Sequence, residues 1–172
     1  MAIYALGDRM PEIDPTAFVH PDATIIGDVA IGPESSIWPG AVLRGDHGLI
    51  RVGARTSIQD GAVVHCTAEH DTVVGDDCTV GHLAHLEGCT IEPGSLVGSG
   101  AAVLHRAIVR TGAIVAAQAL VPPGMDVAAG ALARGVPARI VEGAADPELI
   151  GHATRTYVRN SHWYNAEMRR ID

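Results

Sequence analysis

The chain has 172 residues, a 47% hydrophobic content that is enough for a buried core, and a formal net charge of −8 at pH 7. That length suits one compact domain. The negative charge argues against binding to nucleic acid or to an anionic membrane surface. No run approaches the roughly 20 apolar residues of a membrane-spanning helix, and residues 1–9 lack the layout of a signal peptide. We therefore expect a cytoplasmic protein with no nucleic-acid or membrane partner.

A six-residue repeat of large aliphatic residues runs through most of the sequence. In the later units the fifth position is usually small, as in Ser95, Ala101 and Ala107. Repeats of this period are typical of parallel β-helices, in which three short strands make one triangular coil. A sandwich of short strands gives no reason for a six-residue phase that is held over consecutive units. The leading residues are Ile25, Ile31, Ile37, Leu43, Val52, Ile58, Val64, Val74, Val80, Leu86, Ile91, Val97, Val103, Val109, Val115, Val121 and Val127.

Two interruptions of the repeat predict loops. The spacing is nine residues from Leu43 to Val52 and ten residues from Val64 to Val74, so extra residues loop out at 46–48 and at 67–71. Loops on a rigid repeat are common places for binding sites.

The repeat also predicts which polar side chains stack. With three units in each coil, Arg44, His65 and Glu87 follow leading residues of one face and should lie on consecutive coils. Asp60 and His82 should stack on a different face. Two faces of one rod cannot meet within a single chain, whereas a second copy would bring them together. Assembly of three copies with closed cyclic symmetry would create three equivalent interface sites.

The remaining histidines and the cysteines have simpler interpretations. We interpret four histidines as solvated side chains, namely His20, His105, His152 and His162. The chain has an odd number of cysteines, and none is part of a Cys-x-x-Cys pair. Cys78 occupies a fifth position and is predicted to be a small core residue.

The repeat stops before Asp146. The run Asp146-Pro147-Glu148 is a typical helix start, and apolar residues at helical spacing follow it. We therefore predict an all-β domain at residues 1–143, formed by the β-helix, and a C-terminal α-helix at residues 144–172 that packs along it.

Four segments resemble the γ-class carbonic anhydrases and their relatives: Ser36–Asp46, Ser57–Asp60, Val64–His65 and Val80–Cys89. The resemblance covers about residues 13–139. It implies a left-handed parallel β-helix of hexapeptide repeats, a homotrimer, and one metal ion held by three histidines at each interface. Parallel crossovers are otherwise right-handed, so the handedness depends on the resemblance alone. The implied metal is zinc, with iron(II) or cobalt as alternatives, and the implied reaction is reversible hydration of carbon dioxide to bicarbonate by a metal-bound hydroxide.

The resemblance also assigns roles near the metal, with one departure. His65 and His82 match two of the three ligands, and Gln59 matches the residue that orients the metal-bound water or bicarbonate. The third histidine of the family falls where this chain has Glu87. Either Glu87 ligates, in a set that zinc and iron(II) accept, or His85 replaces the missing ligand after a local change of register, or no metal is tightly bound. An anionic ligand is expected to slow the hydration.

Further site residues follow from the same resemblance. Arg44 and Asp60 match an ion pair that bridges subunits, with Asp46 beside it, and the fork of an arginine suits a carboxylate. His47 and His70 lie in the looped-out segments. They are candidate proton shuttles because imidazole titrates near neutral pH.

Two other classes of function stay open. Hexapeptide β-helices include acyltransferases that bind acetyl-CoA between subunits, where His65 or His82 would act as general base. The chain has no obvious acceptor-binding domain for that reaction. A non-catalytic binding trimer is the third class, for which a missing metal ligand is expected. The sequence thus favours a carbonic-anhydrase-like lyase. The metal content of the purified protein separates this class from the other two, and binding to CoA separates an acyltransferase from a non-catalytic trimer.

Overall fold

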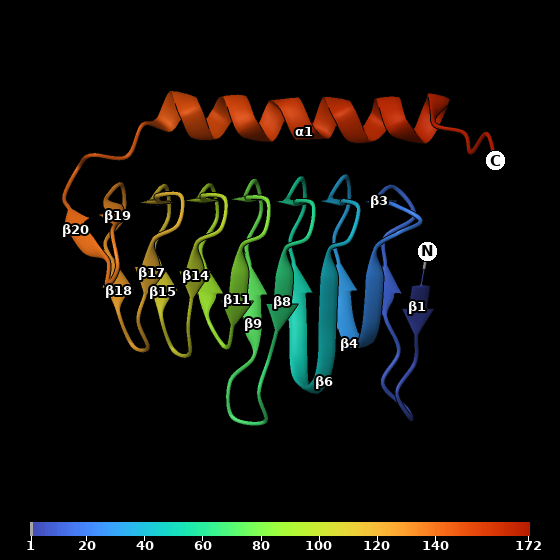
Figure 1. The fold of residues 1–172 in the computed structure, drawn as a ribbon, viewed down its shortest axis with the longest axis horizontal. Helices are drawn as coiled ribbons and strands as arrows, with labels where there is room; N and C mark the ends of the chain where they lie inside the picture. Colours follow the sequence, from blue (N-terminus) through green and yellow to red (C-terminus); the bar gives the residue numbers. More distant parts are fainter. Residues whose placement is uncertain (1) are drawn as a thin grey trace.

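The computed structural model describes residues 2–172 and forms a triangular rod with one long helix beside it (Figure 1). Each coil crosses three faces in turn, and the strands of each face stack in parallel on those of neighbouring coils. The exception is the last strand of the third face, Arg139–Val141, which pairs antiparallel with Leu132–Arg134. The predicted fold, an all-β left-handed parallel β-helix with a C-terminal α-helix, is confirmed.

We number the three faces in the order in which the chain crosses them, starting from the corner that lies beside the C-terminal helix. The first face contains β1 (Ala2–Tyr4), the first parts of β4 (Thr24–Ile31) and β6 (Val42–Val52), β8 (Val63–His65), β11 (His85–Glu87), β14 (Ala102–Val103) and β17 (Leu120–Val121). The second face contains β2 (Glu12–Ile13), the last parts of β4 and β6, β9 (Thr72–Val74), β12 (Thr90–Ile91), β15 (Ile108–Val109) and β18 (Asp126–Val127). The third face contains β3 (Phe18–Val19), β5 (Ser36–Ile37), β7 (Ser57–Ile58), β10 (Thr79–Val80), β13 (Leu96–Val97), β16 (Ile114–Val115), β19 (Leu132–Arg134) and β20 (Arg139–Val141).

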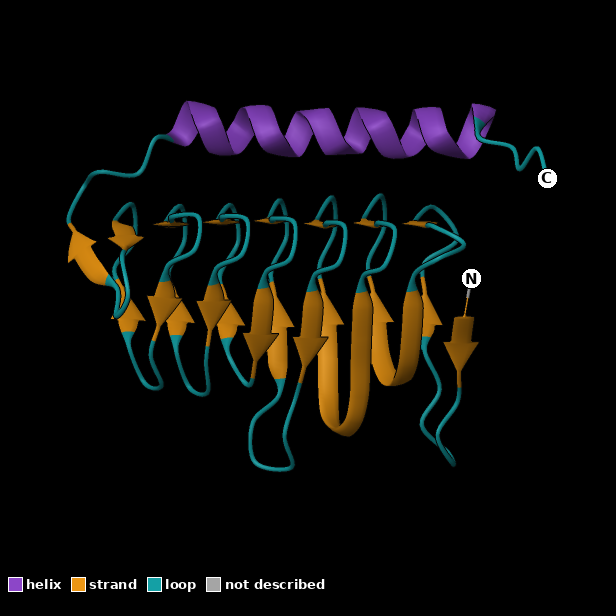
Figure 2. Cartoon of the chain, in the orientation of Figure 1, coloured by secondary structure: helices purple, strands orange, loops and turns teal. Residues whose placement is uncertain are grey.

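Strands β4 and β6 are long because each continues around the corner between the first and second faces (Figure 2). On the first face Thr24–Gly27 of β4 pairs with β6, and the pairing resumes on the second face at Val29. The bend of β6 contains residues 46–48, and residues 67–71 connect β8 to β9. Both predicted loops therefore lie at this one corner.

The leading aliphatic residues point into the rod and form its core. Ile37, Leu43, Ile58, Val64 and Leu86 have no exposed surface. Full burial of such a side chain contributes about 1.5–3 kcal/mol, so the column stabilises the rod along its whole length. The small fifth-position residues fill the corners of the core, and Ser95, Ala101, Ala107, Ala113 and Ala131 are likewise fully buried.

Close approach of neighbouring coils leaves no room for a Cβ atom at several glycines, and Gly27 is the tightest of them. Gly27 has φ +77°, and a Cβ atom built there would lie 2.2 Å from the carbonyl oxygen of Gly45. Gly94 has a similar φ of +66°, but a Cβ atom there would meet nothing within 4 Å. Gly94→Ala should therefore cost only the left-handed backbone penalty of about 1–2 kcal/mol. Gly27→Ala should cost about 3 kcal/mol more because the coils must separate.

Thermal unfolding of the two variants measures this difference, since they share the backbone penalty. A melting temperature for Gly27→Ala equal to that of Gly94→Ala would contradict the steric explanation.

The C-terminal helix α1 (Pro147–Glu167) lies along the third face. Asp146 caps it, because its side chain accepts a hydrogen bond from the backbone N–H of Glu148 at 2.9 Å. Aromatic rings fasten the helix to the rod, with Trp38 packing 5.6 Å from Tyr157 and 5.1 Å from Tyr164 between ring centroids. Within residues 2–172, no helical segment has the length and hydropathy of a membrane span.

The three cysteines are free thiols inside the rod. Burial raises the pKa of Cys78 to about 11 and the pKa of Cys89 to about 12. The prediction that Cys78 is a core residue is confirmed, and Cys66 is also fully buried. Because all three thiols are buried and only accessible thiolates react quickly, the native protein should show almost no reaction with a thiol reagent at pH 8. The unfolded chain should show all three thiols. Titration with Ellman's reagent, with and without denaturant, checks this; rapid labelling of the native protein would contradict it.

Candidate metal centre at the edges of the first face

The predicted stack of Arg44, His65 and Glu87 is present on the first face. Arg44 pairs with His65 in the register of β6 and β8, and His65 pairs with Glu87 in the register of β8 and β11. All three residues lie at the corner between the first and second faces. The six-residue repeat therefore predicted their alignment correctly, although two loops of different lengths separate them.

His65 lies between two carboxylates at this corner. Its Nδ1 atom is 2.9 Å from Oε1 of Glu87, and its Nε2 atom is 3.0 Å from Oδ1 of Asp46. Asp46 also forms an ion pair with Arg44, and Arg9 donates a hydrogen bond to the backbone carbonyl of Asp46. Arg9 belongs to the N-terminal segment, to which the sequence assigned no role.

The electrostatics of the two carboxylates follow from these contacts. A hydrogen bond from His65 is the main reason that the pKa of Glu87 lies below its usual value, while burial opposes the shift. For Asp46, burial raises the pKa, but hydrogen bonds from His65 and Arg44 together with the charge of Arg44 outweigh it. Both side chains are therefore carboxylates at neutral pH, and each can act as a hydrogen-bond acceptor or as a metal ligand.

The lowered pKa of Glu87 predicts how stability depends on pH. A carboxylate with a depressed pKa stabilises the folded state above the unfolded pKa, near 4.5, and this contribution is lost as the pH falls through the folded pKa. In metal-free protein, Glu87→Gln should therefore lower the melting temperature at pH 7 and should differ less from wild type as the pH is lowered below 4.5. Thermal unfolding between pH 3 and pH 7 checks this. A difference that is the same at all pH values would contradict the assigned hydrogen bond.

The loop at residues 67–71 is tied to the bend of β6 beside this cluster. Asp71 accepts a hydrogen bond from the backbone N–H of Leu49 at 2.9 Å. His70, one of the two candidate proton shuttles, lies against the corner at Gly88, directly after Glu87. His47, the other candidate, is exposed in the bend of β6. Their role in proton transfer stays a prediction.

A second group of predicted residues lies at the opposite edge of the first face, next to α1. Asp60 and His82 stack as predicted, with Oδ2 of Asp60 2.9 Å from Nδ1 of His82. Gln59 lies beside them and is almost fully buried. The hydroxyl of Tyr157 from α1 is 3.5 Å from Nε2 of His82, a contact that the sequence did not predict.

The two groups do not meet within one chain. His82 lies at the start of the first-face segment of its coil, and Glu87 lies at its end, five residues further on. Within residues 2–172, no three His, Cys, Asp or Glu side chains are arranged so that they could hold a metal ion. Arg44 pairs with Asp46 and Asp60 pairs with His82, so the bridging ion pair between Arg44 and Asp60 would also need a second subunit.

The donor chemistry of both groups fits a zinc site that is shared between subunits. The carboxylate of Asp60 holds Nδ1 of His82 and leaves Nε2 to ligate, which is the common carboxylate–histidine arrangement around metal ions. Two ligands of a tetrahedral zinc ion lie about 3.3 Å apart, given bonds of about 2.0–2.1 Å. Nδ1 of His65 and Oε1 of Glu87 are 2.9 Å apart, so a small widening would admit an ion. Two histidines and one carboxylate are a set that zinc accepts.

Two further histidines lie near Glu87. Whether His85 could replace the missing ligand after a local change of register stays a prediction. In regular register, residues 85 and 87 of β11 face the same side, and Nε2 of His85 is 3.4 Å from Oε2 of Glu87. His105 was interpreted as solvated, but its Nε2 atom is 3.7 Å from the same oxygen. His105 lies one coil beyond Gly88, the residue after Glu87, and this position in the repeat could have predicted the contact.

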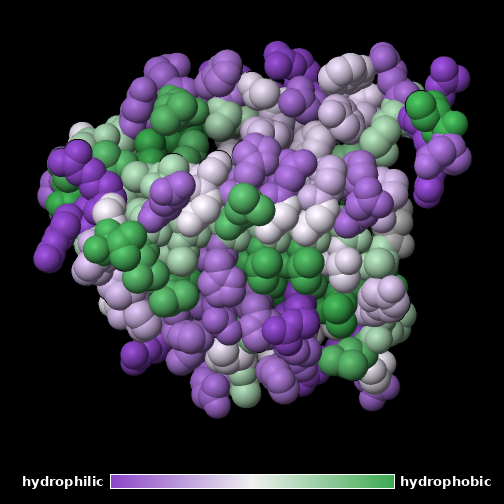
Figure 3. Space-filling model, viewed as in Figure 1, coloured by the Kyte–Doolittle hydropathy of each residue, from purple (hydrophilic) through white to green (hydrophobic). Residues whose placement is uncertain are grey.

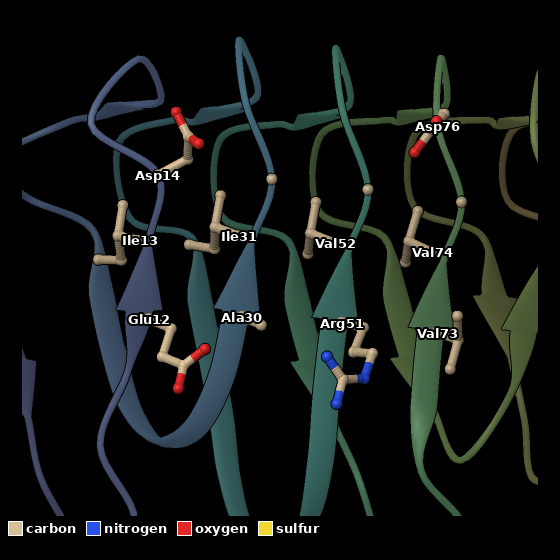
Figure 4. A pocket seen from close by; sticks show the side chains of 13 residues that line it. Glu12, Ile13, Asp14, Ala30, Ile31, Arg51, Val52, Val73, Val74 and Asp76 are labelled. Atoms are coloured by element: carbon tan, nitrogen blue, oxygen red, sulfur yellow. The ribbon is translucent and has the colours of Figure 1, made fainter.

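A shallow groove of about 600 Å³ lies elsewhere, on the second face (Figure 4). The outward side chains of Glu12 and Arg51 line it, with Asp14 and Asp76 at the next corner. None of the predicted site residues lines this groove, so it is separate from the two groups on the first face.

Comparison with known proteins identifies the family. No protein-family model matches the chain. The chain is 43% identical over 168 residues to Gamma carbonic anhydrase 1, mitochondrial, of Arabidopsis thaliana, a match that covers 93% of this chain and 61% of that protein. It is 42% identical over 149 residues to Carnitine operon protein CaiE of Escherichia coli K12, covering 87% of this chain and 76% of that protein.

Solved structures agree with these relatives. A Bacillus cereus protein assigned as an acetyltransferase superposes with a TM-score of 0.93 at 34% identity, covering 96% of this chain and 97% of the other. A hexapeptide transferase family protein from Anaplasma phagocytophilum gives a TM-score of 0.91 at 38% identity, covering 95% and 98%. Sequence identity and fold agree over nearly the whole chain, which therefore belongs to the family of hexapeptide-repeat proteins that are like γ-carbonic anhydrases.

Proposed function

We propose that three copies of the chain assemble around a threefold axis and that each interface binds one zinc ion. The ligands would be His65 and Glu87 of one subunit and His82 of the next, and the site would hydrate carbon dioxide reversibly to bicarbonate. The observation that carries this proposal is the placement of two partial ligand sets at opposite edges of the first face. One threefold rotation can bring such edges together at every interface.

The surface between the two edges supports this assembly. Outward positions of the first face align in one register as Val42, Val63, His85, Ala102 and Leu120, which are apolar except for His85. Val63 is 37% exposed, and Leu83 at the adjoining corner is 71% exposed. Figure 3 shows hydrophobic surface across the middle of the rod with polar residues below it. An apolar strip with polar margins is typical of a subunit interface.

The chain's own groups have definite tasks in the proposed site. Asp60 holds His82 in the tautomer that presents Nε2. Arg44 and Asp46 fix the outer side of His65. Gln59 is nearly buried beside Asp60 and would orient a bound bicarbonate with its amide. Tyr157 would add a hydroxyl next to His82, and the exposed His47 would carry protons away to buffer.

A zinc ion bound there would supply Lewis-acid activation of water near neutral pH. The Arabidopsis relatives bear the name of this activity, but the chain spans only about 60% of their length, so the activity is proposed for this chain on its own residues.

Elemental analysis tests the proposal. Untagged protein, purified without chelator, should contain about one zinc per chain, and His65→Ala and His82→Ala should each lose it because one ligand is missing from every site. Stopped-flow assays should then detect carbon dioxide hydration only in the wild type. Wild-type protein that folds normally and binds no metal, even after incubation with zinc, would refute the proposed site. His152→Ala is the matched control, because His152 is exposed on α1.

A second function rests on the structural neighbours, two of which are named as an acetyltransferase or as a transferase family member. In that case the interface would bind acetyl-CoA, and a histidine would act as general base. Calorimetric titration with acetyl-CoA distinguishes the two: saturable binding by metal-free protein would favour acyl transfer, and absence of binding would exclude it.

A further inference from the structure

Three imidazole rings from consecutive coils lie near Glu87. Its Oε1 atom faces His65, whereas its Oε2 atom faces His85 at 3.4 Å and His105 at 3.7 Å. The two oxygens therefore have separate partners. His85 shares strand β11 with Glu87, but His105 comes from the next coil, directly after β14.

The position of His105 is held by the backbone of the corner. The backbone N–H of Arg106 donates a hydrogen bond to the carbonyl of Gly88 at 2.6 Å, which places one corner directly over the other. A Cβ atom at Gly88 would lie 3.1 Å from Cδ2 of His105 and 2.9 Å from Cβ of His70. The ring centroids of His70 and His105 are 6.3 Å apart, so both side chains lie at this corner. Glycine at position 88 is what leaves room for His105 beside Glu87.

We propose that His105 is a positioning residue for Glu87: with His85 it holds Oε2, so that Oε1 is presented beside Nδ1 of His65. This inference rests on the proposed zinc site, in which Oε1 of Glu87 is a ligand. A ligating carboxylate is usually held by a further hydrogen-bond donor, and loss of such a donor typically weakens metal binding about 10- to 100-fold. Nε2 of His105 lies 3.7 Å from Oε2, within ion-pair distance but beyond hydrogen-bond distance, so His105 would fill this role after a small approach, from a coil that contains no ligand itself.

Two substitutions separate a polar role, in which Nε2 of His105 attracts Oε2 of Glu87, from a packing role. His105→Phe keeps a ring of similar size against Gly88 but removes both nitrogens. His105→Gln loses the ring but keeps an N–H donor. If His105 positions Glu87, Phe should weaken zinc binding about 10- to 100-fold, measured by competition with a chromogenic chelator, and Gln should restore much of the loss. A packing role would give the reverse order. His152→Phe on the exposed side of α1 is the control.

A second measurement needs no metal. In zinc-free protein with 15N-labelled histidine, the Nδ1 signal of His65 reports its hydrogen bond to Glu87. His105→Phe should shift this signal, and His105→Gln and His152→Phe should leave it close to wild type.

The two measurements keep the inference and the proposed function apart. If wild-type protein binds zinc and His105→Phe changes neither the affinity nor the His65 signal, the positioning role is refuted and the zinc site stands. If wild-type protein binds no zinc but His105→Phe shifts the His65 signal, the zinc site is refuted and the hold on Glu87 stands.

Discussion

Trimers that contain both His65→Ala and His82→Ala subunits should regain about one third of the wild-type zinc content and hydratase activity, although trimers of either variant alone should have almost none. In the proposed arrangement each site takes His65 from one subunit and His82 from the next, always in the same rotational direction. Any trimer that contains both variants then has one interface where an intact His65 faces an intact His82. The other two interfaces lack at least one ligand.

Two affinity tags allow trimers that contain both variants to be isolated. Co-expression of the variants with different tags, followed by two purification steps, selects trimers that contain both kinds of subunit, and native mass spectrometry verifies them. The matched control pairs His65→Ala with Glu87→Ala. These residues lie on the same edge of one subunit, 2.9 Å apart, so no mixture of them restores both in one site.

The pattern of recovery decides where the site lies. Recovery in the first pair and none in the control would place each site between two subunits. No recovery in verified mixed trimers would refute a shared site. Recovery in the control would mean that His65 and Glu87 act in different sites, against their stacking on β8 and β11.

The stacking itself could be predicted from the sequence because a β-helix has a constant repeat. Once the leading residues were aligned, the partners of Arg44 followed by counting units, and loops of any length at one corner left the count unchanged. Leu43, Val64 and Leu86 are buried in one column. Because successive side chains of a strand point to opposite faces, the residues that follow them, Arg44, His65 and Glu87, point outward. This is why His65 and Glu87 were paired correctly without any knowledge of their side-chain contacts.

Other contacts of the site depend on packing between segments that the repeat does not relate. Tyr157 reaches His82 because packing against Trp38 and the third face sets the position of α1 along the rod. The sequence repeat does not predict that position, because the helix is not part of the repeat. Arg9 reaches Asp46 from the N-terminal segment in the same way. His105 was missed for a different reason: Leu86 pairs with Val103, so the register aligns His105 with Gly88 rather than with Glu87.

The substitution Glu87→His should raise the hydratase kcat at least roughly tenfold, which corresponds to about 1.4 kcal/mol of activation free energy. An anionic ligand reduces the Lewis acidity of a zinc ion, and a neutral imidazole leaves more positive charge at the site to activate water. The change would also supply the third histidine that the family resemblance implies. Stopped-flow carbon dioxide hydration by protein of known zinc content measures it.

The side chains around Glu87 oppose its replacement by histidine. Glu87 accepts a hydrogen bond from His65 and lies near His85 and His105, so an imidazole there would place four rings together without the carboxylate that attracts them. Glu87→Gln is the control, because it removes the charge and supplies only a weak amide ligand. It should lose zinc rather than gain activity. If Glu87→His retains one zinc per chain and is no faster than wild type, the charge of the ligand does not limit the reaction. If Glu87→Gln retains zinc as well as wild type does, Glu87 is not a ligand. His85 then becomes the ligand to test by substitution.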